Sequence, residues 1–382
     1  MTEQARLIEL FLQLAKVDGP SRNEGDVAEV VRQRLADLSI VAIVDKAGPS
    51  FGGRSGNLVA HVPGSLTTPA LLLCAHLDTV APTLGLQPQF QAEDLITSDG
   101  STILGADDRA GIAIILEILQ QLLERQIPHG PLDIVFTVCE EAGMHGAKAL
   151  DISRLEATLG LIFDSSAPCG SFVVEAPAAV VFEAVVHGRA AHAAVWPEKG
   201  IHAIQIAAQA ISHLKQGRWG TTGMLNIGTI RGGTAINVIP DRVEILGEFR
   251  SPHPDELQAQ MAHVREAFEG AAAAAGGSVE LTWTSKYDGF SLDSEDPIVR
   301  AVTLGITAAG FDPKPVRYPG GSDANVLNGR GIACVNLGLG YHNVHSHQEA
   351  MPIRCLVDSV TIGLSVIRAL AAMAPTVPGG EV

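Results

Sequence analysis

The sequence has few cysteines and no cluster of positive charge. Its cysteines are odd in number, widely spaced and mostly embedded in apolar runs, and no CxxC pair occurs: Cys74, Cys139, Cys169, Cys334 and Cys355. This pattern excludes a disulfide framework and predicts reduced core residues. The formal net charge of −16, without any basic face, argues against a nucleic-acid partner and against an anionic membrane surface.

Long apolar runs are also missing. No segment approaches the roughly 20 uninterrupted apolar residues of a membrane span. The N-terminal segment 1–17 interleaves charged residues with apolar ones at helical spacing, which indicates an amphipathic helix and not a signal peptide. We therefore expect a cytoplasmic protein with no membrane partner.

Nucleotide-binding signatures are absent as well. The glycine-rich stretch 48–56 lacks the lysine and the spacing of a phosphate loop, so we interpret it as a flexible connector. No GxGxxG follows the first strand, which weakens a nucleotide-binding hypothesis.

The length of 382 residues, with 46% hydrophobic and 18% charged residues, suits a globular protein of two domains. Strand-like and helical runs alternate up to about residue 177, which predicts an α/β fold with a mostly parallel sheet covered by helices. A different block, 178–287, suits an inserted α+β sandwich. We expect a main domain at 1–177 and 288–382, ending in a helix at 359–373 and a frayed tail at 374–382.

Two adjacent carboxylates, Glu140 and Glu141, end the apolar run 132–139. Burying such a pair costs several kcal/mol for each anion unless metal or proton chemistry holds it. A solvated strand end that opens a helix would explain the pair equally well, because acids suit a helix N-terminus. The pair alone does not decide between the two interpretations.

Three more segments of this region carry the same kind of residue at their ends. His76 and Asp78 end the apolar strand 70–76, Asp107 opens a long helix, and Asp164 ends the strand 159–163. A core histidine and a helix-capping aspartate would explain individual members. Together, at one edge of a parallel sheet, these anions repel each other unless cations compensate them, so we expect a site for more than one metal.

The loop 338–352 contains three further histidines, His342, His345 and His347, any of which could supply another imidazole. Histidine and carboxylate ligands without thiolates suit zinc in an open, catalytic site, with cobalt or manganese as substitutes.

Eight motifs together resemble a known family over nearly the whole chain. In order they are CAHLDTV (74–80), LGADDRAG (104–111), CEEAG (139–143), FDSS (163–166), GRAAHA (188–193), NVIPD (237–241), GGSDAN (320–325) and NVHSHQE (343–349). The chain resembles the two-zinc exopeptidases and amidohydrolases that include peptidase T, glutamate carboxypeptidase, aminoacylase and succinyl-diaminopimelate desuccinylase. It is most similar to the peptidase T-like branch.

The resemblance implies a metal ligand set for two Zn²⁺ per chain. Asp107 would bridge the ions and precede a cis peptide bond. His76 and Asp164 would complete one zinc site. Glu141 and His345 would complete the other, with His345 preferred over His347 because it precedes a glutamate, Glu349, by four residues.

The resemblance also implies catalytic and substrate-binding residues. Glu140 would be the general base and Asp78 would support His76. In the inserted domain, His192 resembles a histidine that reaches the active site of a partner subunit, while Asn237 and Arg250 resemble residues that hold the substrate. A homodimer formed through this domain, which would also act as a lid, is implied too.

The expected reaction is hydrolysis of an amide bond of short peptides by a zinc-activated water, as in a tripeptide aminopeptidase. One alternative is an amidohydrolase or carboxypeptidase of the same fold that acts on N-acyl amino acids or C-terminal residues. The alternative from another class is a non-catalytic metal-binding protein.

Overall fold

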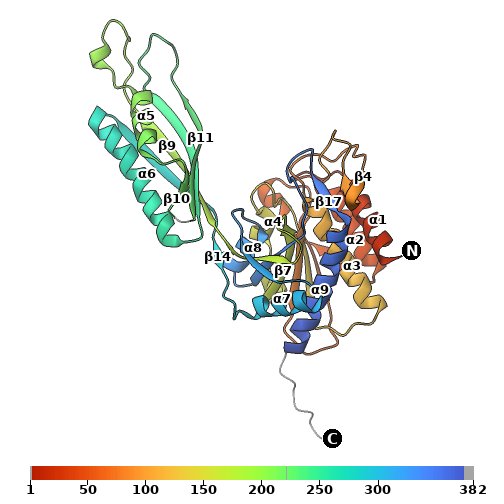
Figure 1. Cartoon of the computed structure of the whole chain (residues 1–382). Helices are drawn as coiled ribbons and strands as arrows, with labels where there is room; N and C mark the ends of the chain where they lie inside the picture. Colours follow the sequence, from red (N-terminus) through yellow and green to blue (C-terminus); the bar gives the residue numbers. More distant parts are fainter. Residues whose placement is uncertain (1, 221, 374–382) are drawn as a thin grey trace. The chain divides into compact units, whose positions relative to one another are not determined.

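The structure is a computed structural model that describes residues 2–220 and 222–373 (Figure 1). The tail predicted at 374–382 lies outside the described residues. The chain divides into two compact units. The first comprises Met1–Val174, Leu292–Arg317 and Ser322–Val382, and the second comprises Glu175–Ser291 and Tyr318–Gly321.

The larger sheet has the strand order β1-β2-β6-β3-β7-β16-β8-β14, with β15 paired to β8. Its strands are β1 (Ala42–Val44), β2 (Leu58–Val62), β3 (Leu71–His76), β6 (Leu132–Thr137), β7 (Leu159–Ser165), β8 (Ser171–Ala176), β14 (Phe290–Ser291), β15 (Lys314–Arg317) and β16 (Ala333–Gly338). The four central strands, β6, β3, β7 and β16, run parallel, and the flanking pairs β1–β2, β2–β6, β16–β8 and β8–β14 are antiparallel. Every residue of β3 and β6 is buried, as expected for strands covered on both faces.

The helices of the first unit pack around this sheet. They are α1 (Glu3–Ala15), α2 (Gly25–Asp37), α3 (Ala106–Glu124), α4 (His145–Ala149), α7 (Pro297–Ala308), α8 (Asp323–Gly329) and α9 (Ile353–Met373). Helix α3 contacts β3 and β7 on one side and α1 and α9 on the other, which explains why most of its residues are buried. A small sheet, β17-β5-β4, adds Ala350–Pro352, Leu95–Thr97 and Gln89–Gln91, and short 3-10 turns occupy Ala92–Asp94 (η2) and Ile152–Arg154 (η3).

Two details differ from expectation. Helix α9 begins at Ile353, six residues before the predicted start. Pro352 suits a helix start, because the first N–H groups of a helix have no intrahelical partner and proline has no N–H group. Ile353 and Leu356 also continue the buried stripe of the helix. The glycine-rich connector contains a 3-10 turn, η1 (Gly48–Phe51), closed by the hydrogen bond from Gly53 N to Gly48 O (2.8 Å), so it is a compact turn.

Helix α9 is also long and apolar enough to cross a membrane by length and composition. Its apolar residues, among them Leu356, Val360, Ile367 and Leu370, pack in the main hydrophobic core of the first unit. Charged residues interrupt it at Arg354, Asp358 and Arg368. This is the environment of a core helix.

The second unit consists of an antiparallel sheet and two helices. The strand order is β10-β11-β12-β9-β13, with β9 (Ala178–His187), β10 (Gly217–Trp219), β11 (Gly223–Gly232), β12 (Arg242–Ser251) and β13 (Ser278–Tyr287). Helices α5 (Ala203–His213) and α6 (Pro254–Ala275) pack on it, and a 3-10 turn, η4, spans Pro197–Lys199. Alternate residues such as Phe182 and Ala184 point into a shared core, so the unit buries its own apolar face.

Candidate active site

The candidate site lies at the carboxyl edge of the parallel strands. His76 ends β3 and pairs with Thr137, the last residue of β6, three residues before Glu140. Asp164 lies near the end of β7, the other neighbour of β3. Parallel strands end at one edge of the sheet, so residues that are far apart in the sequence meet there.

Asp107 lies between two histidines. Its Oδ1 is 3.0 Å from Nε2 of His76, and its Oδ2 is 3.4 Å from Nε2 of His345. The backbone at Asp107 and Asp108 is not helical, and the peptide bond between them is cis, as the resemblance implies. Each carboxylate oxygen of Asp107 therefore faces a different imidazole, which is the arrangement of a bridging ligand.

The other predicted ligands divide between these two imidazoles. Asp164 Oδ1 lies 3.6 Å from His76 Nε2, and Glu141 Oε1 lies 3.1 Å from His345 Nε2. His347 points elsewhere: its Nδ1 is 2.9 Å from the carbonyl oxygen of Gly100. The geometry thus groups His76 with Asp164 and His345 with Glu141, on either side of Asp107.

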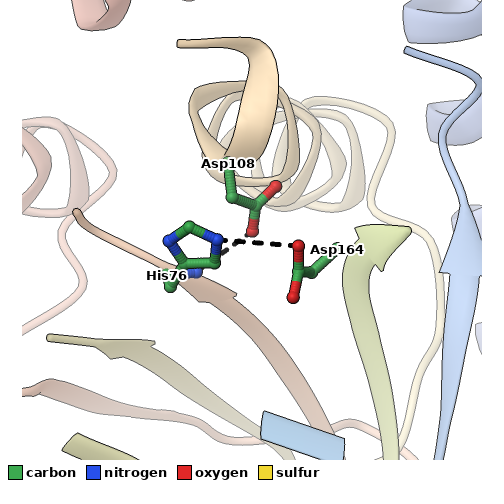
Figure 2. Close-up of side chains that lie close together, drawn as sticks. All are labelled: His76, Asp108 and Asp164. Atoms are coloured by element: carbon green, nitrogen blue, oxygen red, sulfur yellow. Dashed lines mark hydrogen bonds and ion pairs between the residues drawn. The ribbon is translucent and has the colours of Figure 1, made fainter. Parts of the chain in front are cut away.

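Asp108 joins the cluster without having been predicted as a ligand. Figure 2 shows its carboxylate beside His76 and Asp164, where donor atoms of all three lie within 4.8 Å of one another. Its Oδ2 accepts the backbone N–H of His76 (3.0 Å) and its Oδ1 accepts that of Gly111 (3.0 Å). Because backbone donors already use both oxygens, Asp108 positions His76 and the first turn of α3.

Asp78 holds the two halves of the site together. It is fully buried, and its Oδ1 accepts the backbone N–H of Glu140 (2.9 Å), while its Oδ2 accepts that of Glu141 (3.1 Å) and the hydroxyl of Ser21 (2.6 Å). His76 Nδ1 lies 3.1 Å from the backbone oxygen of Asp78. A proton on Nδ1 leaves Nε2 free as a metal ligand.

Glu140 is buried, and its environment disfavours the anion. Burial raises the pKa of Glu140 well above its ordinary value, and the charges of Asp164 and Asp323 raise it further, against the lowering effect of His76. Burial likewise raises the pKa of Asp164 to about 7. Glu140 and Asp164 therefore hold their protons to a higher pH than exposed carboxyl groups do.

Three supporting residues lie outside the predicted set. Glu349, which had been noted only for its spacing from His345, is buried and accepts the backbone N–H groups of Gly105 (2.7 Å) and Asp107 (3.0 Å). Tyr341 donates its hydroxyl to Asp164 Oδ1 (3.2 Å), and Ser21 donates to Asp78. These residues are far in sequence from the groups they contact and follow no periodic pattern, so only the four-residue spacing of Glu349 from His345 pointed to one of them.

The three predicted substrate residues lie in the second unit. His192 and Asn237 are exposed and belong to neighbouring segments: His192 forms a β-bridge with Val238, and Ala193 N donates to Asn237 O (3.0 Å). Arg250 pairs with Glu248 (3.2 Å) near the last residue of β12. The bridge between His192 and Val238 lies next to the opposite end of β12, which begins at Arg242. Within this unit the structure brings His192 and Asn237 together and leaves Arg250 at the other end of the sheet.

The donor set fits divalent cations. It offers two imidazoles and several carboxylates without a thiolate, which suits zinc, cobalt or manganese. Oε1 of Glu141 is buried with His345 Nε2 as its neighbour at 3.1 Å, and Oδ1 of Asp323 is buried without a hydrogen-bond partner. His76, Asp107 and Glu141 form a second group of donor atoms within 4.8 Å of one another. Buried carboxylates this close stay charged together only if cations compensate them.

Comparison with known proteins identifies similar chains. The family described as peptidase family M20/M25/M40 matches residues 72–372. The structure of aminopeptidase PepT from Bacillus cereus ATCC 10987 is 37% identical, with a TM-score of 0.92 over 96% of this chain and 99% of that chain. A tripeptidase from Staphylococcus aureus subsp. aureus Mu50 is 36% identical, with a TM-score of 0.93 over 97% of this chain and 99% of that chain.

A further relative, the uncharacterized protein YqjE of Bacillus subtilis strain 168, is 38% identical over 97% of this chain and 100% of its own length. The resemblance inferred from the eight motifs is confirmed by these matches, including the peptidase T-like branch, and so is the α/β fold class with a separate sheet-rich unit. The chain therefore belongs to peptidase family M20/M25/M40 and is a peptide hydrolase.

Proposed function

We propose that the protein is a dizinc aminopeptidase, similar to peptidase T, that acts on short peptides, with tripeptides as the preferred class. The observation that carries the proposal is the carboxylate of Asp107, which lies 3.0 Å from His76 Nε2 and 3.4 Å from His345 Nε2. The names of two structures of similar chains, aminopeptidase PepT and a tripeptidase, support the substrate class.

The ions would be held by residues of one sheet edge. His76 and Asp164 would hold one, Glu141 and His345 the other, with Asp107 between them. When bound, two zinc ions would polarise the scissile carbonyl and lower the pKa of a water molecule. Cobalt or manganese ions are the expected substitutes.

Glu140 is the proposed general base. Its side chain is buried, and its backbone is fixed to Asp78, so its carboxylate is held in place at the strand end. It would accept the proton of the attacking water and return it to the leaving amine. Glu141, although adjacent, differs in role because its carboxylate faces His345 at 3.1 Å.

Replacing Glu140 tests this assignment. We expect Glu140→Ala to abolish hydrolysis while the zinc content stays near that of the wild-type protein, because Glu140 moves a proton and is not a ligand. The control is Glu141→Ala, which should lose metal as well as activity. Hydrolysis that survives in Glu140→Ala would refute the role of Glu140 as general base. Activity of the metal-depleted protein without added zinc would refute the metal dependence of the reaction.

A substrate panel separates the proposal from its nearest alternative. Tripeptides with a free N-terminus should be cleaved to an amino acid and a dipeptide, and the same tripeptides with an acetylated N-terminus should not. Preferential cleavage of N-acyl amino acids, or release of C-terminal residues, would instead favour an amidohydrolase or carboxypeptidase of the same fold.

We further propose that the second unit contributes substrate binding through His192, Asn237 and Arg250 and pairs with its copy in a cytoplasmic homodimer. A monomer in light scattering would refute the dimer. Each substitution, His192→Ala, Asn237→Ala or Arg250→Ala, should raise KM while the zinc content stays near that of the wild-type protein.

A further inference from the structure

Two of the five cysteines lie next to each other in the first unit and are not among the candidate metal ligands. Cys169 belongs to the loop after β7, and Cys355 lies in the first turn of α9. Their side chains are neighbours, since each thiol shifts the pKa of the other. The Sγ of Cys169 is also 3.8 Å from the hydroxyl oxygen of Ser359, which lies one helical turn after Cys355. The Cys169 side chain therefore rests on the helix face that carries Cys355.

Gly340 packs against both cysteines. A Cβ added to Gly340 would lie 2.9 Å from Cys355 Sγ and 3.5 Å from the backbone nitrogen of Cys169. The backbone N–H of Gly340 donates to the carbonyl oxygen of Ala167 (3.0 Å). Three segments that are distant in the sequence thus converge at this pair of thiols.

The pair differs from the other cysteines in exposure. Cys169 and Cys355 are partly exposed, whereas Cys74, Cys139 and Cys334 are fully buried. Burial raises the thiol pKa of each of these three. The neighbouring Cys169 thiol lowers the pKa of Cys355, and Cys355 in turn raises the pKa of Cys169. Reactive thiols are those that are accessible and ionise readily.

We propose that Cys169 and Cys355 form a thiol–disulfide site, in which a hydroperoxide oxidises the pair to a disulfide and a dithiol reduces it again. Sensor cysteines typically combine an accessible thiolate with a neighbouring thiol that resolves the first oxidation product. Cys355 would be the attacking cysteine and Cys169 the resolving one. Both cysteines pack against Gly340, and the Cys169 sulfur lies on the helix face that carries Cys355, so the sulfurs are neighbours that a disulfide would bring to about 2 Å.

The reaction balances with hydrogen peroxide as oxidant. The Cys355 thiolate attacks one peroxide oxygen, the O–O bond breaks, and the departing hydroxide takes up the thiol proton as water, leaving a sulfenic acid. Cys169 sulfur then attacks the sulfenic sulfur, the S–O bond breaks, and hydroxide leaves with the Cys169 proton as a second water. The two thiols lose two electrons and one peroxide molecule gains them.

The disulfide would also act on the candidate metal site. The residue after Gly340, Tyr341, donates its hydroxyl to Asp164. Joining the sulfurs would draw the loop of Cys169 and the start of α9 together around Gly340 and disturb that hydrogen bond. We expect the oxidised protein to hydrolyse peptides several-fold more slowly and a dithiol to restore the rate. This consequence rests on the proposed function, whereas formation of the disulfide does not.

Mapping of the cysteines tests the site without any activity measurement. The full-length, metal-loaded protein is treated with graded hydrogen peroxide, digested without reduction and examined by mass spectrometry. We expect a peptide pair joined through Cys169 and Cys355, lost on addition of dithiothreitol, while Cys74, Cys139 and Cys334 stay reduced as internal controls. Earlier oxidation of those three, or irreversible oxidation of Cys355 with Cys169 still reduced, would overturn the proposal.

Two conservative variants assign the roles. In Cys169→Ser, Cys355 should stop at the sulfenic acid and react with a dione probe. In Cys355→Ser, Cys169 should react much more slowly with peroxide. Equal labelling of the two variants would overturn the order of attack. An unchanged hydrolysis rate in wild-type protein whose disulfide is complete would overturn the coupling to the metal site, and Cys355→Ser, which cannot form the link, provides the matched control.

Discussion

The carboxylate of Asp78 accepts the backbone N–H of Glu140 at 2.9 Å, so a buried hydrogen bond joins the loop after β3 to the turn after β6. The same carboxylate accepts the backbone N–H of Glu141 at 3.1 Å. Asp78 therefore orients the Glu140–Glu141 pair in addition to supporting His76, the role that the resemblance implies. Asp78 fixes the relative positions of the proposed base and of candidate ligands from both proposed metal sites.

Replacing Asp78 by asparagine should weaken the whole site. The amide retains one acceptor oxygen and places an NH₂ group among donors, so at least one hydrogen bond is lost. We expect a loss of roughly 10–100-fold in zinc affinity or kcat, the usual effect of removing a partner that orients metal ligands. Ser21→Ala removes only one donor and should cost less. Zinc titration and kcat at saturating zinc measure both, and wild-type values in Asp78→Asn would contradict the orienting role.

Metal stoichiometry should distinguish the bridging carboxylate from the terminal ligands. Because Asp107 faces both histidines, Asp107→Ala should reduce binding of both zinc ions, whereas His345→Ala should reduce binding of one. His347→Ala is the matched control, since its ring faces Gly100, and it should bind zinc as the wild type does. Elemental analysis after dialysis gives the ratios. Equal losses in His345→Ala and His347→Ala would show that the predicted histidine is wrong.

The buried Asp323 should make stability depend on pH. Its Oδ2 accepts the hydroxyl of Thr137, and burial raises its pKa to about 6. The unfolded chain releases this proton at about pH 3.9, so between about pH 4 and 6 the folded chain holds a proton that the unfolded chain lacks. Raising the pH through this window therefore lowers the free energy of unfolding, by on the order of 2–3 kcal/mol from this group.

The variant Asp323→Asn isolates that contribution. Urea unfolding of the metal-free protein from pH 4 to 7 should show a shallower decline in the variant than in the wild type. Asp99→Asn is the control, because a hydrogen bond from Ser101 lowers the pKa of Asp99, and its titration falls below this window. Parallel profiles for wild type and Asp323→Asn would exclude the raised pKa.

The ion pair between Arg6 and Glu117 should stabilise the packing of α1 on α3. The guanidinium donates to both Glu117 oxygens, at 2.7 and 2.9 Å, and Glu117 is 2% exposed. Arg6→Gln leaves this carboxylate without its cation, and we expect the free energy of unfolding to fall by about 1–3 kcal/mol. Arg32→Gln breaks an exposed pair with Glu29 and should change stability little. Chemical denaturation measures both, and equal effects would argue against a buried contribution.

Local patterns in the sequence were sufficient for most elements. Apolar runs ending in polar residues located β3, β6 and β7, and the 3.6-residue period located α1, α3 and α6, because these signals depend on neighbouring residues. Local sequence gave less information about β8, because β8 pairs with β16, a strand some 160 residues later in the chain. Apolar periodicity did not reveal the early start of α9, because its first two turns carry the charged residues Arg354 and Asp358.

Four candidate ligands, His76, Asp107, Glu141 and Asp164, were predictable because each ends or follows a strand or opens a helix, whereas the choice of His345 came from the family resemblance. The supporting residues were not predictable. Glu349, Tyr341 and Ser21 are distant in sequence from the groups they contact, and a hydrogen bond between such segments leaves no trace in local composition. Placement of Arg250 away from His192 and Asn237 likewise follows from the register of β12, which no local pattern specifies.

The sequence by itself determined the fold class, the family and the residue types that can hold two cations, because periodicity and ordered motifs are written in the chain. Only the tertiary structure decided which oxygen of Asp107 faces which histidine, that Asp78 joins the Glu140–Glu141 turn to β3, and that Cys169 rests against Cys355. Those relationships arise when segments from distant parts of the chain are packed at one sheet edge, where burial and hydrogen bonding select one arrangement.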